Sequence, residues 1–277
     1  MEHQVKLGYL NIQSLKNLNS PTILKKLNQL KGLIERKQPD VLAITESWLR
    51  NDRKYDALEI DGYTLFREDR PYDERGGGVL LYVRAGLEPN RIQVPRSESA
   101  DQLFVSICFN GNTYVIGVVY DPPLKKNYSV NDKKNFVDAL RNSLVLATEV
   151  SNTVVCVGDV NVNFLDTDSS LTRYFSGMLS RIGFIQMIRE PTHYTSTETL
   201  IDVLLCKEPR IVTEPILEEL DGFSKHRYIS CNIGVTVTSD DNSNSTTALG
   251  PSSDDDIIQD SIRSVNTTAL SLSLLRI

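Results

Sequence analysis

Polar side chains able to bind metal or transfer protons stand where apolar runs of the chain end or break. Asn11 and Glu46 each follow an apolar run. Asp159 and Asn161 follow a third run, and Asp202 interrupts a fourth. Singly, carboxylates and amides at such positions are typical of turns and helix caps. Because strand ends in α/β proteins converge on one edge of a sheet, the five together favour a shared site.

This set of side chains suits a hard divalent cation. Carboxylate and amide oxygens are preferred ligands of Mg²⁺ and Mn²⁺, and the sequence has no His/Cys cluster with zinc spacing. Mg²⁺ keeps open positions for water and phosphate oxygens, and it stabilises charge on a reacting phosphate. The residues therefore predict a reaction that depends on Mg²⁺ (or Mn²⁺) and acts on a phosphate-bearing substrate.

The elements that must position these residues are mainly strands. Apolar runs with β-branched residues predict strands over 5–12, 41–45, 79–83, 103–109, 114–120, 154–157, 200–206 and 229–237. Leucines and isoleucines at three- and four-residue spacing predict a helix over 23–34, with Ser20 as candidate N-cap before Pro21. Similar patterns at 136–144 and 171–182 suggest two more helices.

The order of these elements indicates a mixed-sheet α/β protein. Asn110-Gly111 lies between two predicted strands and tolerates the positive φ of a type I′ turn, so we expect a hairpin there. Residues 239–256 are small, polar and acidic, as in a linker that cannot bury enough apolar surface to order itself. We therefore expect a folded domain over 1–238 and a disordered acidic tail over 239–277.

Composition narrows the class of protein. Of the 277 residues, 40% are apolar and 24% charged, which is ordinary for a globular protein, and the net charge of -6 disfavours bulk coating of nucleic acid. The first residues lack a secretion signal and no apolar run is long enough to span a membrane, so we expect an intracellular protein of nucleus or cytoplasm. No stable protein partner is predictable. Single cysteines inside apolar runs predict buried, reduced thiols at Cys108, Cys156, Cys206 and Cys231.

Seven segments, in order along the chain, resemble the motifs of the endonuclease/exonuclease/phosphatase superfamily. They are residues 10–15 (LNIQSL), 45–49 (TESWL), 76–79 (GGGV), 120–123 (YDPP), 158–163 (GDVNVN), 200–202 (LID) and 224–226 (SKH). The amino-acid sequences of these segments are most similar to those of endonuclease domains of LINE-type, jockey-like non-LTR retrotransposons. The resemblance implies a DNase-I-like fold, a four-layer sandwich of two mixed β-sheets flanked by helices. It also implies a metal-dependent enzyme that nicks double-stranded DNA at a retrotransposon target site.

The resemblance further implies roles for single residues around the metal. Glu46, with Asn11 nearby, would hold Mg²⁺ or Mn²⁺. Asp159 would orient or deprotonate the attacking water, a task for which a carboxylate is a competent base. His226 would stabilise charge on the phosphate in the transition state, with Asp202 supporting the site.

Three more residues would contact the DNA. Asn161 would hold the scissile phosphate together with Asp159, and Tyr120 would also contact that phosphate. Arg70 is the basic residue that we expect to bind the DNA backbone.

Lys225 is the one departure from the superfamily's pattern. The superfamily usually has Asp at this position, where the carboxylate orients the imidazole and adds negative charge near the metal. Loss of an orienting Asp costs serine proteases up to roughly 10⁴ in rate. An enzyme impaired by Lys225 is therefore an open alternative. Asp221 is near enough in the sequence to be a speculative substitute.

Other features have a structural and a functional interpretation. Residues 76–78, three glycines, are expected to form a flexible turn more often than a phosphate cradle. Trp48 is expected to pack beneath the site instead of stacking on a base, and His193 to be a surface residue of a loop.

Two alternatives to the nicking endonuclease stay open. The chain could be a catalytically impaired remnant that folds and binds DNA, for which Lys225 is the main support. It could also be a phosphatase or phosphodiesterase of the same superfamily, although the aromatic-Cys-Asp-Arg motif of inositol phosphatases is replaced here by Leu-Ile-Asp-Val at 200–203.

Overall fold

A computed structural model describes the part of the chain that contains the expected site. The described residues are 4–16, 20–69, 76–95, 101–123, 129–220 and 222–234. All of them belong to one compact unit that extends over residues 1–237. Arg70, Asp221 and the predicted tail over 239–277 lie outside the described residues, so the predicted domain boundary at 238 stays a prediction.

The first sheet has six strands with one parallel pair at its centre. In spatial order the strands are β13 (Ile216–Glu218), β14 (Tyr228–Ile233), β1 (Val5–Asn11), β2 (Val41–Thr45), β4 (Val79–Arg84) and β3 (Tyr63–Glu68). β1 and β2 run parallel, and every other neighbouring pair is antiparallel. A parallel pair needs a long crossover, and α1 (Pro21–Lys37) supplies it.

The second sheet repeats this plan. Its spatial order is β5 (Asn90–Ile92), β6 (Asp101–Phe109), β7 (Asn112–Tyr120), β8 (Val154–Asp159), β12 (Asp202–Cys206) and β9 (Ile185–Gln186). β7 and β8 are parallel and are joined through α2 (Val130–Val150). α3 (Ser170–Ile182) follows β8, and β10 (His193–Tyr194) pairs with β11 (Glu198–Thr199) in a separate two-stranded hairpin.

The helices begin with different caps. Ser129 and Asp132 form a reciprocal capping box at the start of α2, which satisfies two backbone donors that would otherwise lack partners. Ser20 occupies the N-cap position of α1 as expected, but its side chain makes no capping hydrogen bond. Three short 3₁₀ turns complete the structure, at Asp56–Leu58, Ala85–Leu87 and Pro209–Ile211.

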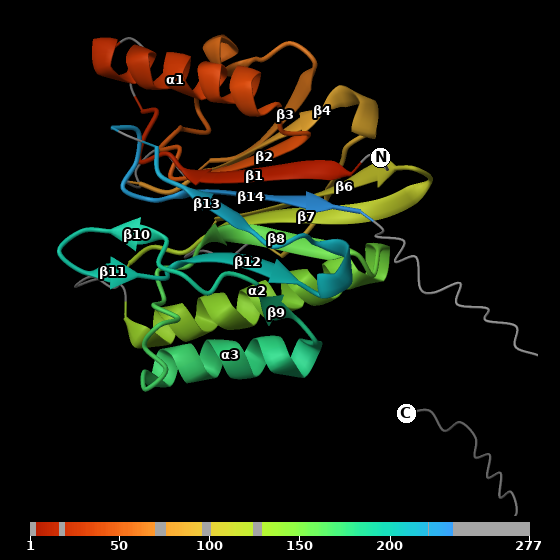
Figure 1. The fold of residues 1–277 in the computed structure, drawn as a ribbon, viewed down its shortest axis with the longest axis vertical. Coiled ribbons are helices and arrows are strands. Elements are labelled where there is room, and N and C mark those ends of the chain that lie inside the picture. The colour runs from red at the N-terminus through yellow and green to blue at the C-terminus, as the bar shows by residue number, and fades with distance from the viewer. Residues whose placement is uncertain are drawn as a thin grey trace, which may run out of the picture. The chain divides into compact units, whose positions relative to one another are not determined.

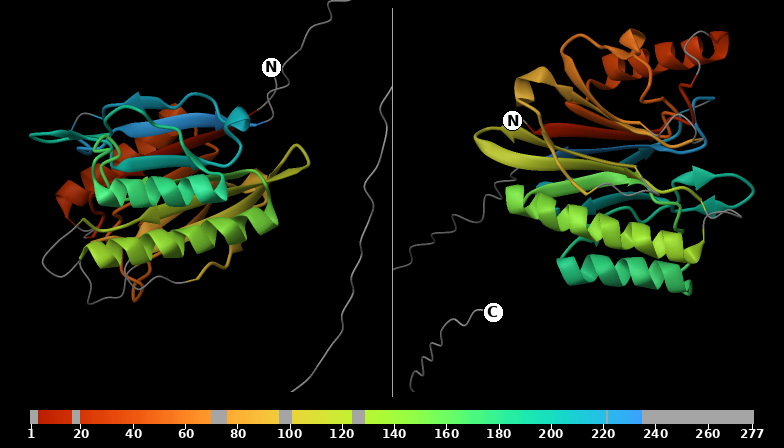
Figure 2. Two further views of the ribbon diagram at one scale, coloured as in Figure 1. Left: turned by 90° about the horizontal axis from the view of Figure 1, so that it is seen from below. Right: turned by 180° about the vertical axis from the view of Figure 1, so that it is seen from behind.

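The two sheets pack face to face with helices on both outer faces (Figures 1 and 2). One apolar core lies between the sheets and contains Tyr9, Val118 and Leu204. A second lies between the second sheet and α2 and α3, and a third between the first sheet and α1. The fold is therefore the predicted four-layer α/β sandwich, and burial of both faces of each sheet explains the nearly continuous apolar runs.

One end of this sandwich collects the polar residues of the sequence motifs. The parallel strands β1, β2, β7 and β8 all end there, at Asn11, Thr45, Tyr120 and Asp159. Antiparallel neighbours begin at the same end, so Asp202, the first residue of β12, is paired with Asp159. The expectation that Asp202 interrupts a strand is corrected: it starts one, and the reversed direction of β12 brings it to the site.

Most predicted strands are confirmed, with shifted ends. Asn110 and Gly111 both have positive φ between β6 and β7, as the predicted type I′ hairpin requires. β3, β5, β9, β10, β11 and β13 were not predicted, because they are short or alternate with polar residues. Cys108 is exposed, contrary to expectation, whereas the other three cysteines are buried; all four are free. No helix among the described residues is long and apolar enough to cross a membrane.

Candidate active site

Asn11 joins two carboxylates that come from different sheets. Its Nδ2 atom donates to Oε1 of Glu46 and to Oδ2 of Asp159, each at 2.9 Å. Its Oδ1 atom accepts the backbone N–H of Gln13 at 3.1 Å. The amide nitrogen of Asn11, not its oxygen, therefore faces the carboxylates, and metal binding by Asn11 would require the amide to present its oxygen.

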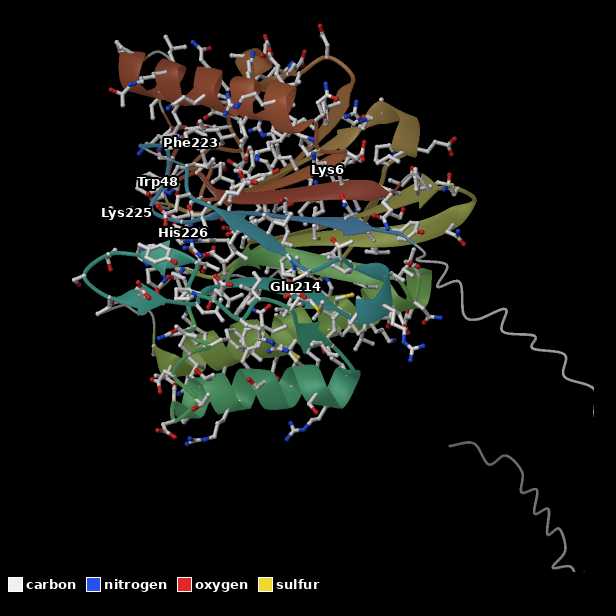
Figure 3. All side chains as sticks on the ribbon, viewed as in Figure 1. Lys6, Trp48, Glu214, Phe223, Lys225 and His226 are labelled. Carbon is white, nitrogen blue, oxygen red and sulfur yellow. The ribbon has the colours of Figure 1, made fainter. Side chains whose placement is uncertain are left out.

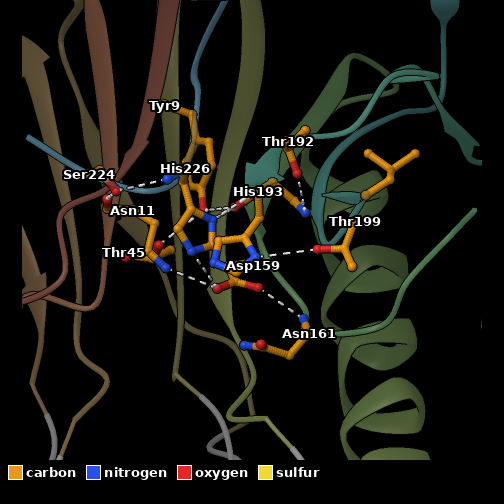
Figure 4. A network of polar contacts seen from close by, with 12 residues as sticks. Tyr9, Asn11, Thr45, Asp159, Asn161, Thr192, His193, Thr199, Ser224 and His226 are labelled. Carbon is orange, nitrogen blue, oxygen red and sulfur yellow. Dashed lines mark hydrogen bonds and ion pairs between the residues drawn. The ribbon is translucent and has the colours of Figure 1, made fainter. Parts of the chain in front are cut away.

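His226 lies beside these carboxylates and is held by Asp202. Its Nδ1 atom is 2.9 Å from Oδ2 and 3.1 Å from Oδ1 of Asp202. Its Nε2 atom points toward Asp159, at 4.0 Å from Oδ2 (Figure 4). The hydroxyl of Tyr9 donates to Oδ1 of Asp202 at 2.7 Å. The imidazole therefore has a fixed orientation, with Nε2 directed at the carboxylate cluster.

The carboxylate that orients His226 comes from Asp202 and not from position 225. The resemblance placed the orienting carboxylate at position 225, where this chain has Lys225, but the structure supplies that carboxylate from Asp202 on β12. Ser224 contributes from the backbone side, because its hydroxyl donates to the carbonyl of Asn11 at 2.6 Å and accepts the N–H of His226 at 3.1 Å. Lys225 itself is exposed, at the same end of the molecule as Trp48 and His226 (Figure 3).

Glu46, Asp159 and His226 form a group with metal-binding geometry. Their potential ligand atoms lie within 4.8 Å of one another. Asp159 is almost completely buried and Glu46 half-buried, so the group opens to solvent on the Glu46 side. Two carboxylates held this close together repel each other unless a cation lies near them.

The pKa values of both Asp159 and His226 are raised in this cluster. Burial raises the pKa of Asp159, and the neighbouring charge of Asp202 raises it further. Burial alone would lower the pKa of His226, but the charge of Asp202, its hydrogen bond and the charge of Asp159 outweigh burial and raise that pKa to about 9. The two carboxylates thus favour the protonated imidazole, whose Nε2–H is a hydrogen-bond donor.

Asn161 is fixed by a buried support under the site. Its backbone N–H donates to Oδ1 of Asp159 and its Nδ2 to the carbonyl of Asp121, each at 2.9 Å. Lys133 of α2 is fully buried beneath, pairs with the Asp121 carboxylate at 2.5 Å and donates to the carbonyl of Val160 at 2.8 Å. Lys133 thus ties together the segment at Asp121 and the segment at 159–160, and each of these segments carries one hydrogen-bond partner of Asn161.

Tyr120 ends β7 and is paired across the sheet with Asp159, which ends β8. Its side chain is 4% exposed. The pairing brings Tyr120 to the correct end of the second sheet, and its expected contact with a phosphate stays a prediction.

Strained backbone is concentrated in the loops of the site. Of the eight non-glycine residues with positive φ among the described residues, five lie in site loops: Gln13, Ser14, Glu46, Trp48 and Asn161. Such conformations cost roughly 1–3 kcal/mol each and persist where surrounding contacts impose them. Hydrogen bonds between the loops after β1 and β2 hold these positive-φ conformations, because the Ser14 N–H donates to the carbonyl of Glu46 at 2.8 Å.

His193 is part of the site, which corrects the expectation of a surface residue. Its ring lies against that of His226, with centroids 4.5 Å apart. It is half-buried, and its Nδ1 lies 3.3 Å from Oγ1 of Thr199. The hairpin β10–β11 reaches this position because the N–H of Tyr194 donates to the carbonyl of Lys225 at 3.2 Å.

Tyr9 and Lys133 are functional candidates that the motifs missed. Tyr9 lies two residues before Asn11 on one strand, so both side chains point to the same face, and that spacing was the available signal. Lys133 gave no comparable signal, because a lysine in an amphipathic helix is normally a solvent-exposed residue.

A family model and several solved structures match this chain. The model of the Endonuclease/Exonuclease/phosphatase family matches residues 8–227. An AP endonuclease, LMAP, from Leishmania major is 15% identical with a TM-score of 0.67, over 83% of this chain and 87% of that one. The endonuclease domain of TRAS1, a telomere-specific non-LTR retrotransposon, is 14% identical with a TM-score of 0.61, over 83% and 98%.

A third structure is a 3′ phosphatase from Neisseria bound to a product DNA hairpin. It is 16% identical with a TM-score of 0.59, over 83% of this chain and 99% of that one. At these identities the likeness establishes the shared fold. A search of curated protein sequences gave no match.

Proposed function

The chain belongs to the endonuclease/exonuclease/phosphatase family, and we propose that it is a divalent-metal-dependent endonuclease that nicks one strand of duplex DNA. The observation that carries the proposal is the convergence of Glu46, Asp159 and His226 at one end of both sheets. Two carboxylates with a nearby cationic donor suit attack on a phosphodiester. The similar structures named for AP endonuclease, retrotransposon endonuclease and DNA 3′ phosphatase support DNA as the substrate.

The residues present fit Mg²⁺ or Mn²⁺ better than zinc. The donor set contains two carboxylates and an amide, all with oxygen ligands, against a single imidazole, and the Nδ1 atom of that imidazole is already engaged by Asp202. We assign the metal to Glu46, with Asn11 beside it. A bound divalent cation would supply Lewis-acid stabilisation of charge on the phosphate.

Asp159 is the group best placed to hold or accept a proton from the attacking water. Both of its oxygens already accept hydrogen bonds, from Asn11 and from Asn161 N–H, so its orientation is fixed before substrate binds. Its raised pKa makes it a stronger base than an ordinary aspartate.

His226 supplies positive charge to the phosphate. Asp202 accepts the Nδ1 proton, which leaves Nε2–H directed toward the position between Glu46 and Asp159. Asn161 donates its backbone N–H to Asp159 and Tyr120 is the strand partner of Asp159, and we propose that both contact the scissile phosphate. Arg70 is proposed to bind the DNA backbone.

The likeness to the TRAS1 domain supports a retrotransposon origin. In that setting the product of nicking would be a 3′-hydroxyl at the target site. We further propose that the nuclease domain ends near residue 238.

Nicking of supercoiled plasmid in Mg²⁺ tests the proposal. We expect the full chain to convert supercoiled plasmid to the open circle, and Glu46→Ala to abolish the conversion. A duplex with one abasic site and a duplex with a 3′-phosphate are the matched substrates for the alternative activities. If only one of these two is processed, the phosphodiesterase or phosphatase alternative replaces the proposal. If none is processed by a folded protein, the chain is a remnant.

A further inference from the structure

The carboxylate of Glu46 is held from both sides by neutral donors. Asn11 Nδ2 donates to Oε1 at 2.9 Å and the indole Nε1 of Trp48 donates to Oε2 at 3.1 Å. A carboxylate oxygen has two lone pairs, so each oxygen keeps one for a further partner. Both donors are uncharged, so they fix the direction of the carboxylate without neutralising the negative charge that attracts a cation.

The backbone turn that carries Glu46 and Trp48 brings both side chains to one place. Glu46 has φ +54° and Trp48 has φ +56°, and two left-handed residues so close together turn the chain sharply. The N–H of Trp48 donates to the carbonyl of Gly77 at 2.8 Å, and the N–H of Ser47 to that of Gly78 at 3.1 Å. The glycine triplet at 76–78 is thus bonded to this turn through the carbonyls of Gly77 and Gly78, which act as acceptors.

The triplet favours glycine for its backbone conformation and, at Gly78, for lack of space. A Cβ at Gly78 would lie 2.5 Å from Oγ of Ser47, and one at Gly76 would lie 3.7 Å from Nε1 of Trp48. All three glycines have φ between +74° and +83°. The triplet therefore owes its glycines mainly to the left-handed backbone, with the close approach of Ser47 at Gly78 as a second reason, and the backbone that results is the one that bonds to the Glu46–Trp48 turn.

We propose that Trp48 is a positioning residue for the metal-binding carboxylate of Glu46, acting through its indole N–H. The proposal rests on the proposed function for the presence of a metal, and it concerns how the carboxylate is aimed. Groups that orient a metal ligand from outside the coordination sphere commonly contribute roughly 10- to 100-fold in metal affinity. Loss of the indole N–H should therefore weaken metal binding even where the fold is retained.

The test measures Mn²⁺ binding to the full chain without DNA, from the electron paramagnetic resonance signal of free Mn²⁺. Trp48 is replaced by β-(3-benzothienyl)alanine, which keeps the shape of the indole and lacks its N–H, and separately by Trp48→Phe. We expect both to weaken Mn²⁺ binding by about 10-fold or more. Tyr63→Phe is the matched control, because it also removes hydroxyl hydrogen bonds, one to the carbonyl of Pro39 and one from Arg84, far from the motif.

A second measurement uses the fact that the chain has one tryptophan. Addition of Mn²⁺ should change the fluorescence of Trp48 in the parent and leave it unchanged in Glu46→Gln. An unchanged signal in the parent, or equal Mn²⁺ affinity of the benzothienyl variant and the parent, would overturn the proposal. An equal loss of affinity in the Glu46→Gln background would do the same, because Trp48 would then act independently of Glu46.

These outcomes separate the inference from the proposed function. Mn²⁺ binding that depends on Trp48 in a protein that does not nick DNA supports the inference and overturns the function. Nicking that depends on Glu46, with Mn²⁺ affinity insensitive to the indole N–H, supports the function and overturns the inference.

Discussion

The Nδ1 atom of His226 lies 2.9 Å from a carboxylate oxygen of Asp202, a residue 24 positions earlier in the chain. This contact joins the two sheets, because Asp202 begins β12 and His226 precedes β14. It provides the orienting carboxylate that the chain was expected to have lost at Lys225.

Asp202→Asn should reduce nicking strongly. The asparagine keeps the shape of the side chain but cannot hold the imidazolium with a negative charge, and it favours the wrong imidazole tautomer. By analogy with the orienting aspartate of serine proteases, we expect a loss on the order of 10³- to 10⁴-fold in single-turnover nicking rate. Mn²⁺ affinity, measured in parallel, should stay close to that of the parent. A rate loss of less than about 10-fold would show that His226 does not need this partner.

Lys225→Asp should leave the nicking rate within about 10-fold of the parent, because the imidazole is already oriented by Asp202. Lys225→Ala serves as the control for loss of the lysine alone. The measurement is the initial rate of open-circle formation in Mg²⁺. A gain of 100-fold or more in Lys225→Asp alone would mean that Lys225 impairs the enzyme, as the remnant hypothesis holds.

Stability of the metal-free protein should fall between pH 6 and pH 9. Asp159 and His226 both have folded-state pKa values above their ordinary values, the latter at about 9. The folded state therefore binds more protons than the unfolded chain in this range, and raising the pH removes its advantage. We expect a lower Tm in EDTA at pH 9 than at pH 6, and a smaller difference in Asp159→Asn. Addition of Mg²⁺ at pH 9 should restore part of the loss. A Tm that rises with pH would contradict the assigned shifts.

The buried ion pair of Lys133 and Asp121 should be costly to break on one side only. Both side chains are fully buried, so Lys133→Met removes the lysine charge that faces the buried Asp121 carboxylate, for which we expect a loss of about 3–5 kcal/mol in the free energy of unfolding. The double variant Lys133→Met/Asp121→Leu should recover much of that loss, because well-packed apolar residues often replace buried ion pairs without cost. Urea unfolding measures all three proteins. A double variant less stable than Lys133→Met would refute this account.

The same double variant shows whether the Lys133–Asp121 pair only stabilises the fold or also positions Asn161 for nicking. The carbonyl of Asp121 and the Asn161 side chain stay, but the lysine that donates to the carbonyl of Val160 is gone. We expect a folded protein with slower nicking. An unchanged rate would show that the ion pair serves only the fold.

Many of the strands and helices could be predicted from the sequence, because buried segments consist mainly of apolar residues. The run at 41–45 predicted β2 without error, and Asn110-Gly111 predicted the hairpin between β6 and β7. The motif residues Asn11, Glu46, Asp159, Asn161 and Asp202 were recognised by their places relative to apolar runs, and the structure brings them together. β3 could not be found in this way, because Thr64, Arg67 and Glu68 interrupt its apolar residues.

The contacts within the site could not be predicted, because they depend on how two sheets pack. Tyr9 reaches Asp202 across the space between sheets, and Asn11 reaches Asp159 in the same way. No spacing within one strand encodes those distances.

The main strands of both sheets, the family and the set of polar residues at one end of the sheets could thus be read from the sequence. Only the packed sheets show which carboxylate orients His226, which donors hold Glu46 and where the buried lysine lies. The physical reason is that apolar periodicity is a property of single segments. Hydrogen bonds between segments arise only after the sheets have packed, when burial makes an unpaired polar group costly.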